Sequence, residues 1–309
     1  MATETADTPG IFERMSKSLE RKTKRIILPG MEGLTFYDLW AIYIKGIIEG
    51  TFSTRASAIA YSFFMAIFPF LIFMLNLIPY INFIDDFQLH FLLFMDSLMP
   101  EQSTADAFND IFMDIASTPR AGLLSFTFLL SLFLMTNGVN AIFTGFEFSY
   151  HTHVNRSIVR QYIIAIGVSL IMALLLLLTV IVVVYLTYAV DDIRDLGGLF
   201  ENIVTVQLLT YSAFIILVYF AVATLYYFGT KEGRESNFFS LGALFTTILI
   251  IITTFLFGLY ITNFSNYNEL YGSIGALLVL MVYIWLNSNI LLLGFELNAS
   301  LNKLRKNFN

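Results

Sequence analysis

The chain has 309 residues, of which 57% are hydrophobic and only 13% are charged, and its mean hydropathy is +0.75. Globular domains are about 45–50% apolar and about 25% charged, so this composition excludes an ordinary soluble protein and indicates an integral membrane protein. The formal net charge is −6 and there is no Cys, which excludes disulfides, a thiol nucleophile and cysteine metal ligands.

The N-terminal part is polar. Residues 1–33 predict a basic cytoplasmic tail, which either only fixes the topology or also holds anionic lipid. A single membrane domain is then expected over residues 34–300, followed by a second cytoplasmic tail over 301–309. The membrane domain opens with apolar residues at helical spacing, which predict an amphipathic helix at the membrane interface. This stripe consists of Phe36, Leu39, Trp40, Tyr43 and Ile47.

Six stretches without Asp, Glu, Lys or Arg are long enough to cross a bilayer, which takes about 20 apolar residues. They predict spans at about 57–81, 121–146, 161–190, 203–228, 239–263 and 272–296. The connection at 84–118 carries apolar residues at 3–4 spacing and predicts two short helices forming an outer cap, either a simple cover or the rim of an entrance. The expected fold is therefore an all-α polytopic membrane protein, a bundle of six transmembrane helices with an N-terminal interfacial helix and a short helical cap.

Orientation follows from the basic residues. Fifteen of the 17 Lys and Arg residues fall in the N-terminal segment, the second and fourth connections and the C-terminal tail, and only Arg120 and Arg194 fall in the others. Because basic residues concentrate on the cytoplasmic side, both termini are predicted to be cytoplasmic.

Four segments carry a family resemblance: the start of the first span, the end of the second, and both ends of the last. They read RASAIAY from Arg55 to Tyr61 with Phe68-Pro69, NGVNAIFTGFE from Asn137 to Glu147 with Asn155-Arg156, YGSIGA from Tyr271 to Ala276, and GFELNA from Gly294 to Ala299. In this order they resemble the YihY/BrkB family of bacterial inner-membrane proteins, over about residues 34–300. The resemblance implies six helices, cytoplasmic termini and location in the inner membrane. The family has carried the label ribonuclease BN, now generally regarded as a misassignment, and transport roles have been suggested for it.

Polar groups inside the spans need an explanation, because each is costly in hydrocarbon. Arg55, Glu147 and Glu296 sit at predicted cytoplasmic helix ends, where they either anchor the helices at the interface or pair inside the bundle. The deeper Asn residues either hold helices together or line a solute path between the first, second and sixth helices. The full set of candidate functional residues is Arg55, Tyr61, Pro69, Asn137, Asn140, Glu147, Arg156, Tyr271, Gly272, Gly275, Asn289 and Glu296.

No catalytic, metal or cofactor-binding residues are predicted. His151 and His153 form the only His pair and lack the acidic neighbours of a metallo-hydrolase, which argues against the ribonuclease label. The leading hypothesis is a transporter, exporter or flippase-like permease for a small anionic or lipidic molecule, with Arg55 as an anion contact. The alternative is a non-transporting envelope or scaffold protein. Membrane lipids are the expected partners, nucleic acid is not, and homo-oligomerisation is left open.

Overall fold

The computed structural model describes residues 51–77, 121–148, 157–194, 203–230, 237–263 and 273–308, together with Thr35, Tyr37 and short pieces between residues 89 and 114. The predicted basic tail, most of the interfacial helix, the His pair, Arg156, Tyr271 and Gly272 lie outside these residues.

Six long helices make up most of the described chain, which confirms the all-α membrane fold. They are α3 (Thr51–Leu77), α6 (Ala121–Glu147), α7 (Ile158–Arg194), α8 (Ile203–Gly229), α9 (Leu241–Asn263) and α11 (Ser273–Phe308). All six are long and apolar enough to cross a membrane. A helix is the form that such segments must take, because it satisfies every backbone N–H and C=O internally where no water is present.

Several helices extend beyond the predicted spans. α3 begins at Thr51 rather than near residue 57, and so includes Arg55. α11 has 36 residues, about 54 Å at 1.5 Å per residue, and continues to Phe308 through most of the segment expected to form the C-terminal tail. The predicted spans were limited to stretches without charged residues, whereas the backbone hydrogen bonds of a helix can continue beyond the hydrocarbon. α9 begins after Ser240, whose side-chain oxygen accepts a hydrogen bond from the backbone N–H of Ala243 at 3.2 Å and caps the helix.

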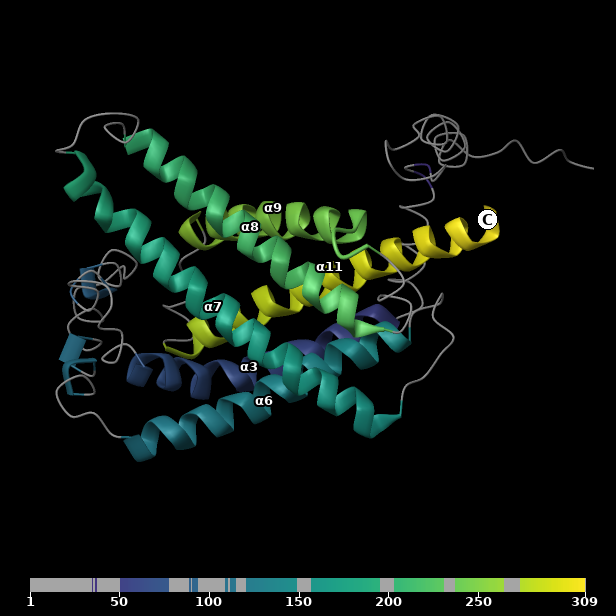
Figure 1. Cartoon of the computed structure of the whole chain (residues 1–309), viewed down its shortest axis with the longest axis horizontal. Helices are drawn as coiled ribbons and strands as arrows, with labels where there is room; N and C mark the ends of the chain where they lie inside the picture. Colours follow the sequence, from purple (N-terminus) through teal and green to yellow (C-terminus); the bar gives the residue numbers. More distant parts are fainter. Residues whose placement is uncertain are drawn as a thin grey trace, which may run out of the picture.

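The helices form a closed ring in chain order. Each packs against the helix before and after it, and α11 returns to pack against α3 (Figure 1). Successive helices run in opposite directions, so the bundle has two ends. We call the end at Thr51, Glu147, Ile158, Gly229, Leu241 and Phe308 the Arg55 end, and the opposite end the Leu77 end.

The core is concentrated in the half of the ring nearer the Arg55 end. Its buried side chains come chiefly from the first halves of α3, α7 and α9 and from the last halves of α6, α8 and α11. Towards the Leu77 end the same helices keep large apolar side chains exposed, such as Leu129 at 63% and Phe255 at 65%. In a bilayer these side chains face lipid, so the ring is held together chiefly at one end.

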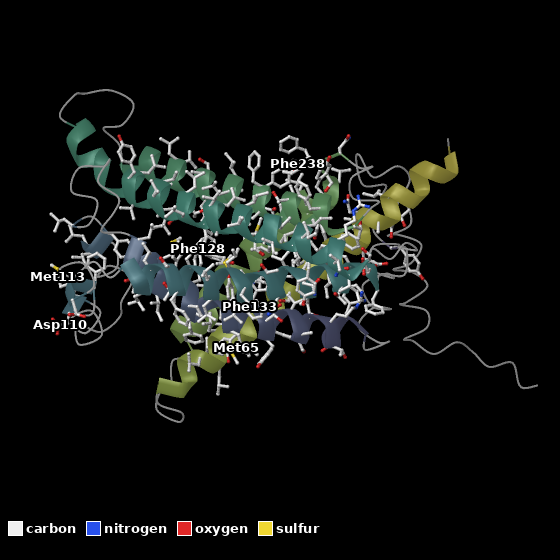
Figure 2. All side chains as sticks on the ribbon, turned by 60° about the horizontal axis from the view of Figure 1, so that its bottom comes forward. Met65, Asp110, Met113, Phe128, Phe133 and Phe238 are labelled. Atoms are coloured by element: carbon white, nitrogen blue, oxygen red, sulfur yellow. The ribbon has the colours of Figure 1, made fainter. Side chains whose placement is uncertain are left out.

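Part of the predicted outer cap is described. Residues 91–93 and 112–114 are helical, and the buried rings of Phe91 and Phe112 lie with centroids 5.7 Å apart. Both phenylalanines belong to the apolar stripes from which the cap was predicted. Figure 2 shows Asp110 and Met113 beyond the Leu77 end of the helices.

Candidate functional site

Arg55 lies on α3 at the Arg55 end of the ring and is partly buried. Its guanidinium Nη1 donates a hydrogen bond of 2.8 Å to the backbone carbonyl of Gly145 on α6. The guanidinium carbon also lies 4.7 Å from the ring centroid of Phe52, one turn earlier on α3, within cation–π range. The charge is therefore held against α6 rather than extended into water.

Glu296 on α11 supplies the opposite charge. It is 4% exposed, and it interacts electrostatically with Arg55. Because a buried carboxylate needs a cation or several donors near it, this interaction supports the predicted pairing of Arg55 with a carboxylate. Glu147, the other predicted partner, is the last residue of α6 and is partly buried. The site thus joins α3, α6 and α11 at one level.

An aromatic cluster fills the ring interior beside this charged site. Phe146 and Phe295 stack with centroids 4.0 Å apart and an interplanar angle of 9°. Tyr226 of α8 meets both rings edge-on, at 5.6 Å from Phe146 and 5.8 Å from Phe295. All three side chains are buried, so α6, α8 and α11 are closed against one another here.

The Tyr226 hydroxyl connects three helices. It lies 2.6 Å from the hydroxyl oxygen of Thr246 on α9 and donates a hydrogen bond of 2.7 Å to the backbone carbonyl of Leu291 on α11. Tyr226 and Thr246 are both almost completely buried. A hydroxyl in this position satisfies its own polarity and fixes the spacing of α8, α9 and α11.

Glycines permit this close packing. A Cβ atom on Gly145 would lie 3.0 Å from the Leu292 side chain, and one on Gly242 would lie 2.6 Å from the carbonyl oxygen of Gly294. A Cβ on Gly294 would meet the Thr246 hydroxyl and would lie 2.6 Å from the Tyr226 hydroxyl. A larger residue at Gly242 would meet backbone and push α9 from α11, and one at Gly294 would clash with buried hydroxyls, whereas at Gly145 the Leu292 side chain would have to shift.

The predicted asparagines do not gather in one place. Asn140 on α6 accepts a hydrogen bond of 2.9 Å from the side-chain amide of Gln161 on α7, which is helix-to-helix packing. Asn289 donates to the Trp285 carbonyl of its own helix at 2.8 Å, and Asn137 is partly buried on α6. The predicted path between α3, α6 and α11 therefore receives no common lining from these three residues.

The remaining candidates are scattered. Tyr61 on α3 is 56% exposed, Pro69 is partly buried within the same helix, and Gly275 is buried near the start of α11. Among the described residues, no group of three His, Cys, Asp or Glu side chains is placed to hold a metal ion.

Sequence reasoning missed the residues that complete the site. Gly145 contributes a backbone carbonyl, and because every residue has one, the sequence gives no sign of this role. Tyr226, Thr246 and Gln161 were not predicted, although a hydroxyl or amide inside a span calls for a partner as an asparagine does.

These helices and this site define a polytopic membrane protein with six membrane-crossing helices and a charged, aromatic closure at one end of the ring. The chain belongs to the family described as virulence factor BrkB, whose family model matches residues 44–308. The earlier resemblance to YihY/BrkB proteins is thereby confirmed.

Relatives of two kinds were found. A Bacillus subtilis protein, YfkH, named as ribonuclease-like, is 30% identical over 259 residues, which cover 82% of this chain and 91% of that protein. A protein of Pseudoalteromonas translucida, named a UPF0761 membrane protein, is 39% identical over 61 residues, 20% of each chain. One of the same name in Psychromonas ingrahamii is 32% identical over 91 residues, 29% of this chain and 31% of that one. No solved structure matches the chain.

Proposed function

We propose that this protein is a flippase-like permease for a small anionic or lipidic molecule, and that the Arg55 end is the closed end of its passage. The observation that carries the proposal is the hydrogen bond of the Arg55 guanidinium to the Gly145 carbonyl, together with its electrostatic interaction with Glu296, inside a ring of membrane-crossing helices. Ionisable groups within such helices are costly and generally serve a pathway or a relay.

Two features support closure at this end. The aromatic cluster of Phe146, Tyr226 and Phe295 fills the ring interior next to the charged site. The hydrophobic core is concentrated in the same half of the ring, while the Leu77 half has fewer buried apolar side chains. A ring packed chiefly at one end is what an alternating passage requires in its closed half-cycle.

This role of Arg55 differs from the anion contact that the sequence suggested. A guanidinium already bonded to a carbonyl and facing Glu296 is engaged within the protein, so its role in the proposal is to hold the closed end rather than to bind a free anion. Release of this contact would separate α3 from α6 and α11.

The competing proposal is a non-transporting scaffold. It is favoured by the Phe and Leu side chains that fill the Arg55 half, because a scaffold needs a filled interior and no passage. Because a closed permease is packed in the same way at its closed end, a measurement of flux is what distinguishes the two proposals.

We do not propose a nuclease, because the ribonuclease-like name belongs to YfkH and is no evidence of that activity in this chain. We further propose an inner-membrane location with cytoplasmic termini, which places the Arg55 end on the cytoplasmic side.

Reconstitution into liposomes tests the proposal. The full chain is assayed for flux of small anions and of fluorescent lipids, alongside the double variant Arg55→Gln/Glu296→Gln. Removing both charges avoids leaving one buried and unpaired, so the double variant should fold. The matched control is Arg160→Gln, which removes a cation from an exposed position near the same end, on α7.

We expect wild-type flux of at least one probe, an increase of tenfold or more in the double variant, and no change in the control. A wild-type protein that moves none of the probes contradicts transport. A double variant with wild-type or lower flux contradicts the closing role of the Arg55–Glu296 interaction.

A further inference from the structure

A second set of polar groups lies between α9 and α11, apart from Arg55. The hydroxyl oxygens of Thr254 on α9 and Tyr283 on α11 lie 2.7 Å apart in the Leu77 half of the ring. Nearer the Arg55 end, the Tyr226 hydroxyl lies beside the Thr246 hydroxyl and donates to the Leu291 carbonyl. We call the line formed by Thr254, Tyr283, Asn287, Thr246, Tyr226 and Asn298 the α9–α11 seam.

The seam follows one face of α11 through most of the membrane. Tyr283, Asn287, Leu291, Gly294 and Asn298 are spaced by four, four, three and four residues, which places them on one side of a helix. Their contacts run antiparallel along α9, from Thr254 opposite Tyr283 to Gly242 opposite Gly294 and Asn298. From Tyr283 to Asn298 the rise is about 22 Å, against a hydrocarbon core of about 30 Å.

Asn287, in the middle of the seam, has an unused acceptor. Its side-chain nitrogen donates to the Tyr283 carbonyl at 2.9 Å, which fixes the orientation of the amide and leaves the amide oxygen as the atom that is not bonded to its own helix. That oxygen is buried, and no group among the described residues donates to it. A buried amide oxygen at this depth is expensive to keep and needs a donor from elsewhere.

At its Leu77 end the seam opens to lipid. Thr254 is exposed, and its neighbours Phe255 and Leu256 are 65% and 57% exposed. A Cβ on Gly258, one turn further along α9, would meet nothing within 4 Å. A hydroxyl pair at a lipid-facing surface, leading to a buried acceptor, is the arrangement that admits a polar group from the side of the bilayer.

We propose that the α9–α11 seam is the track for a lipid headgroup that carries hydrogen-bond donors, a hydroxyl or an ammonium group, while its acyl chains stay in the bilayer. The headgroup enters at Thr254 and Tyr283, donates to the Asn287 oxygen at mid-depth, and is stopped by the Tyr226 contacts that hold α8, α9 and α11 together. This inference rests on the proposed permease function and names its substrate class and route.

The uncharged lining selects the headgroup. Hydroxyls can donate and accept, but the Asn287 oxygen only accepts, so a headgroup without an N–H or O–H cannot satisfy it. Phosphatidylethanolamine and phosphatidylglycerol carry such donors, and phosphatidylcholine does not. The seam should therefore favour the first two over the third.

The test uses the full chain in proteoliposomes with acyl-labelled fluorescent forms of these three lipids. Dithionite bleaching of the outer leaflet measures lipid exchange, and efflux of ethanolamine and glycerol phosphate tests for free solutes. The variants are Asn287→Leu, Tyr283→Phe and Asn289→Leu. Asn289 also donates to its own helix, four residues back, but its two-residue offset from Asn287 places it on a different face of α11, outside the seam.

We expect the two donor-bearing lipids to exchange at least tenfold faster than phosphatidylcholine. Asn287→Leu should lower that exchange tenfold or more and Tyr283→Phe severalfold. Because leucine removes an unsatisfied oxygen, Asn287→Leu should resist detergent unfolding at least as well as wild type, which separates a role in transport from a role in folding.

Three results would overturn the inference while leaving the permease intact. They are equal exchange of phosphatidylcholine, loss of activity in Asn289→Leu but not in Asn287→Leu, and efflux of the free solutes without lipid exchange. Absence of flux for every lipid, solute and anion would overturn the permease proposal as well.

Discussion

Replacing Gly294 by alanine probes the closest helix contact in the ring. The added methyl group would meet the Thr246 hydroxyl oxygen and would lie 2.6 Å from the Tyr226 hydroxyl, both well inside van der Waals contact. Neither neighbour has room to retreat, since Thr246 is 0% and Tyr226 1% exposed. Gly294→Ala should therefore force α9 away from α11 or displace the tyrosine.

The expected loss follows from three contributions. Overpacking of a filled core costs about 1–3 kcal/mol. Displacing Tyr226 weakens two interhelical hydrogen bonds, worth about 0.6 kcal/mol each in membrane proteins. Alanine regains about 0.8–1 kcal/mol of helix propensity over glycine, so the free energy of unfolding should fall by about 1–3 kcal/mol.

Detergent-induced unfolding in mixed micelles, followed by circular dichroism, measures this loss. Gly258→Ala on α9 is the matched control, because nothing lies within 4 Å of the added methyl group. It should be neutral or slightly stabilising. Adding Thr246→Ala to Gly294→Ala removes the nearest obstacle, so the double variant should lose less than the sum of the single losses. Equal stability of Gly294→Ala and Gly258→Ala would refute the described packing of α9 on α11.

Two further variants test other contacts of the ring by the same unfolding measurement. Gln161→Leu removes the amide that donates to Asn140, and should lower stability by about 0.6–1 kcal/mol, whereas an unchanged midpoint would mean that this bond does not hold α7 to α6. Gly229→Ala would place a methyl group 2.5 Å from the Phe146 ring, which is fully buried and stacked, and should cost about 1–3 kcal/mol. Since nothing lies within 4 Å of a methyl group at Gly167, Gly167→Ala on α7 is the control, and a loss of equal size there would contradict a specific clash at Gly229.

The family can be recognised from the sequence, whereas the pairing of charges at the Arg55 end can be seen only in the structure. The motifs around Arg55, Asn137 and Glu296 led to the family because their order along the chain is informative without any knowledge of their contacts. The order of the motifs does not say which residues meet. Arg55 is separated from Gly145 by 90 residues, and it bonds to a backbone carbonyl, which any residue at position 145 would supply.

The sequence by itself determined the membrane class, the number of spans and their approximate limits. These properties depend on the free energy of transferring about 20 consecutive side chains into hydrocarbon, which is additive along the chain and needs no neighbour. The six charge-free stretches therefore matched six helices, with differences only at their ends.

Only the tertiary structure decided which polar groups meet. Helical spacing assigns Asn287 and Asn289 to different faces of α11, but it does not say which helix each face will contact. That depends on the ring order and on close approaches at Gly145, Gly242 and Gly294, where backbone atoms and small residues act as partners. Because such contacts are made between segments far apart in the chain, the closed Arg55 end and the α9–α11 seam appear only once the six helices are packed.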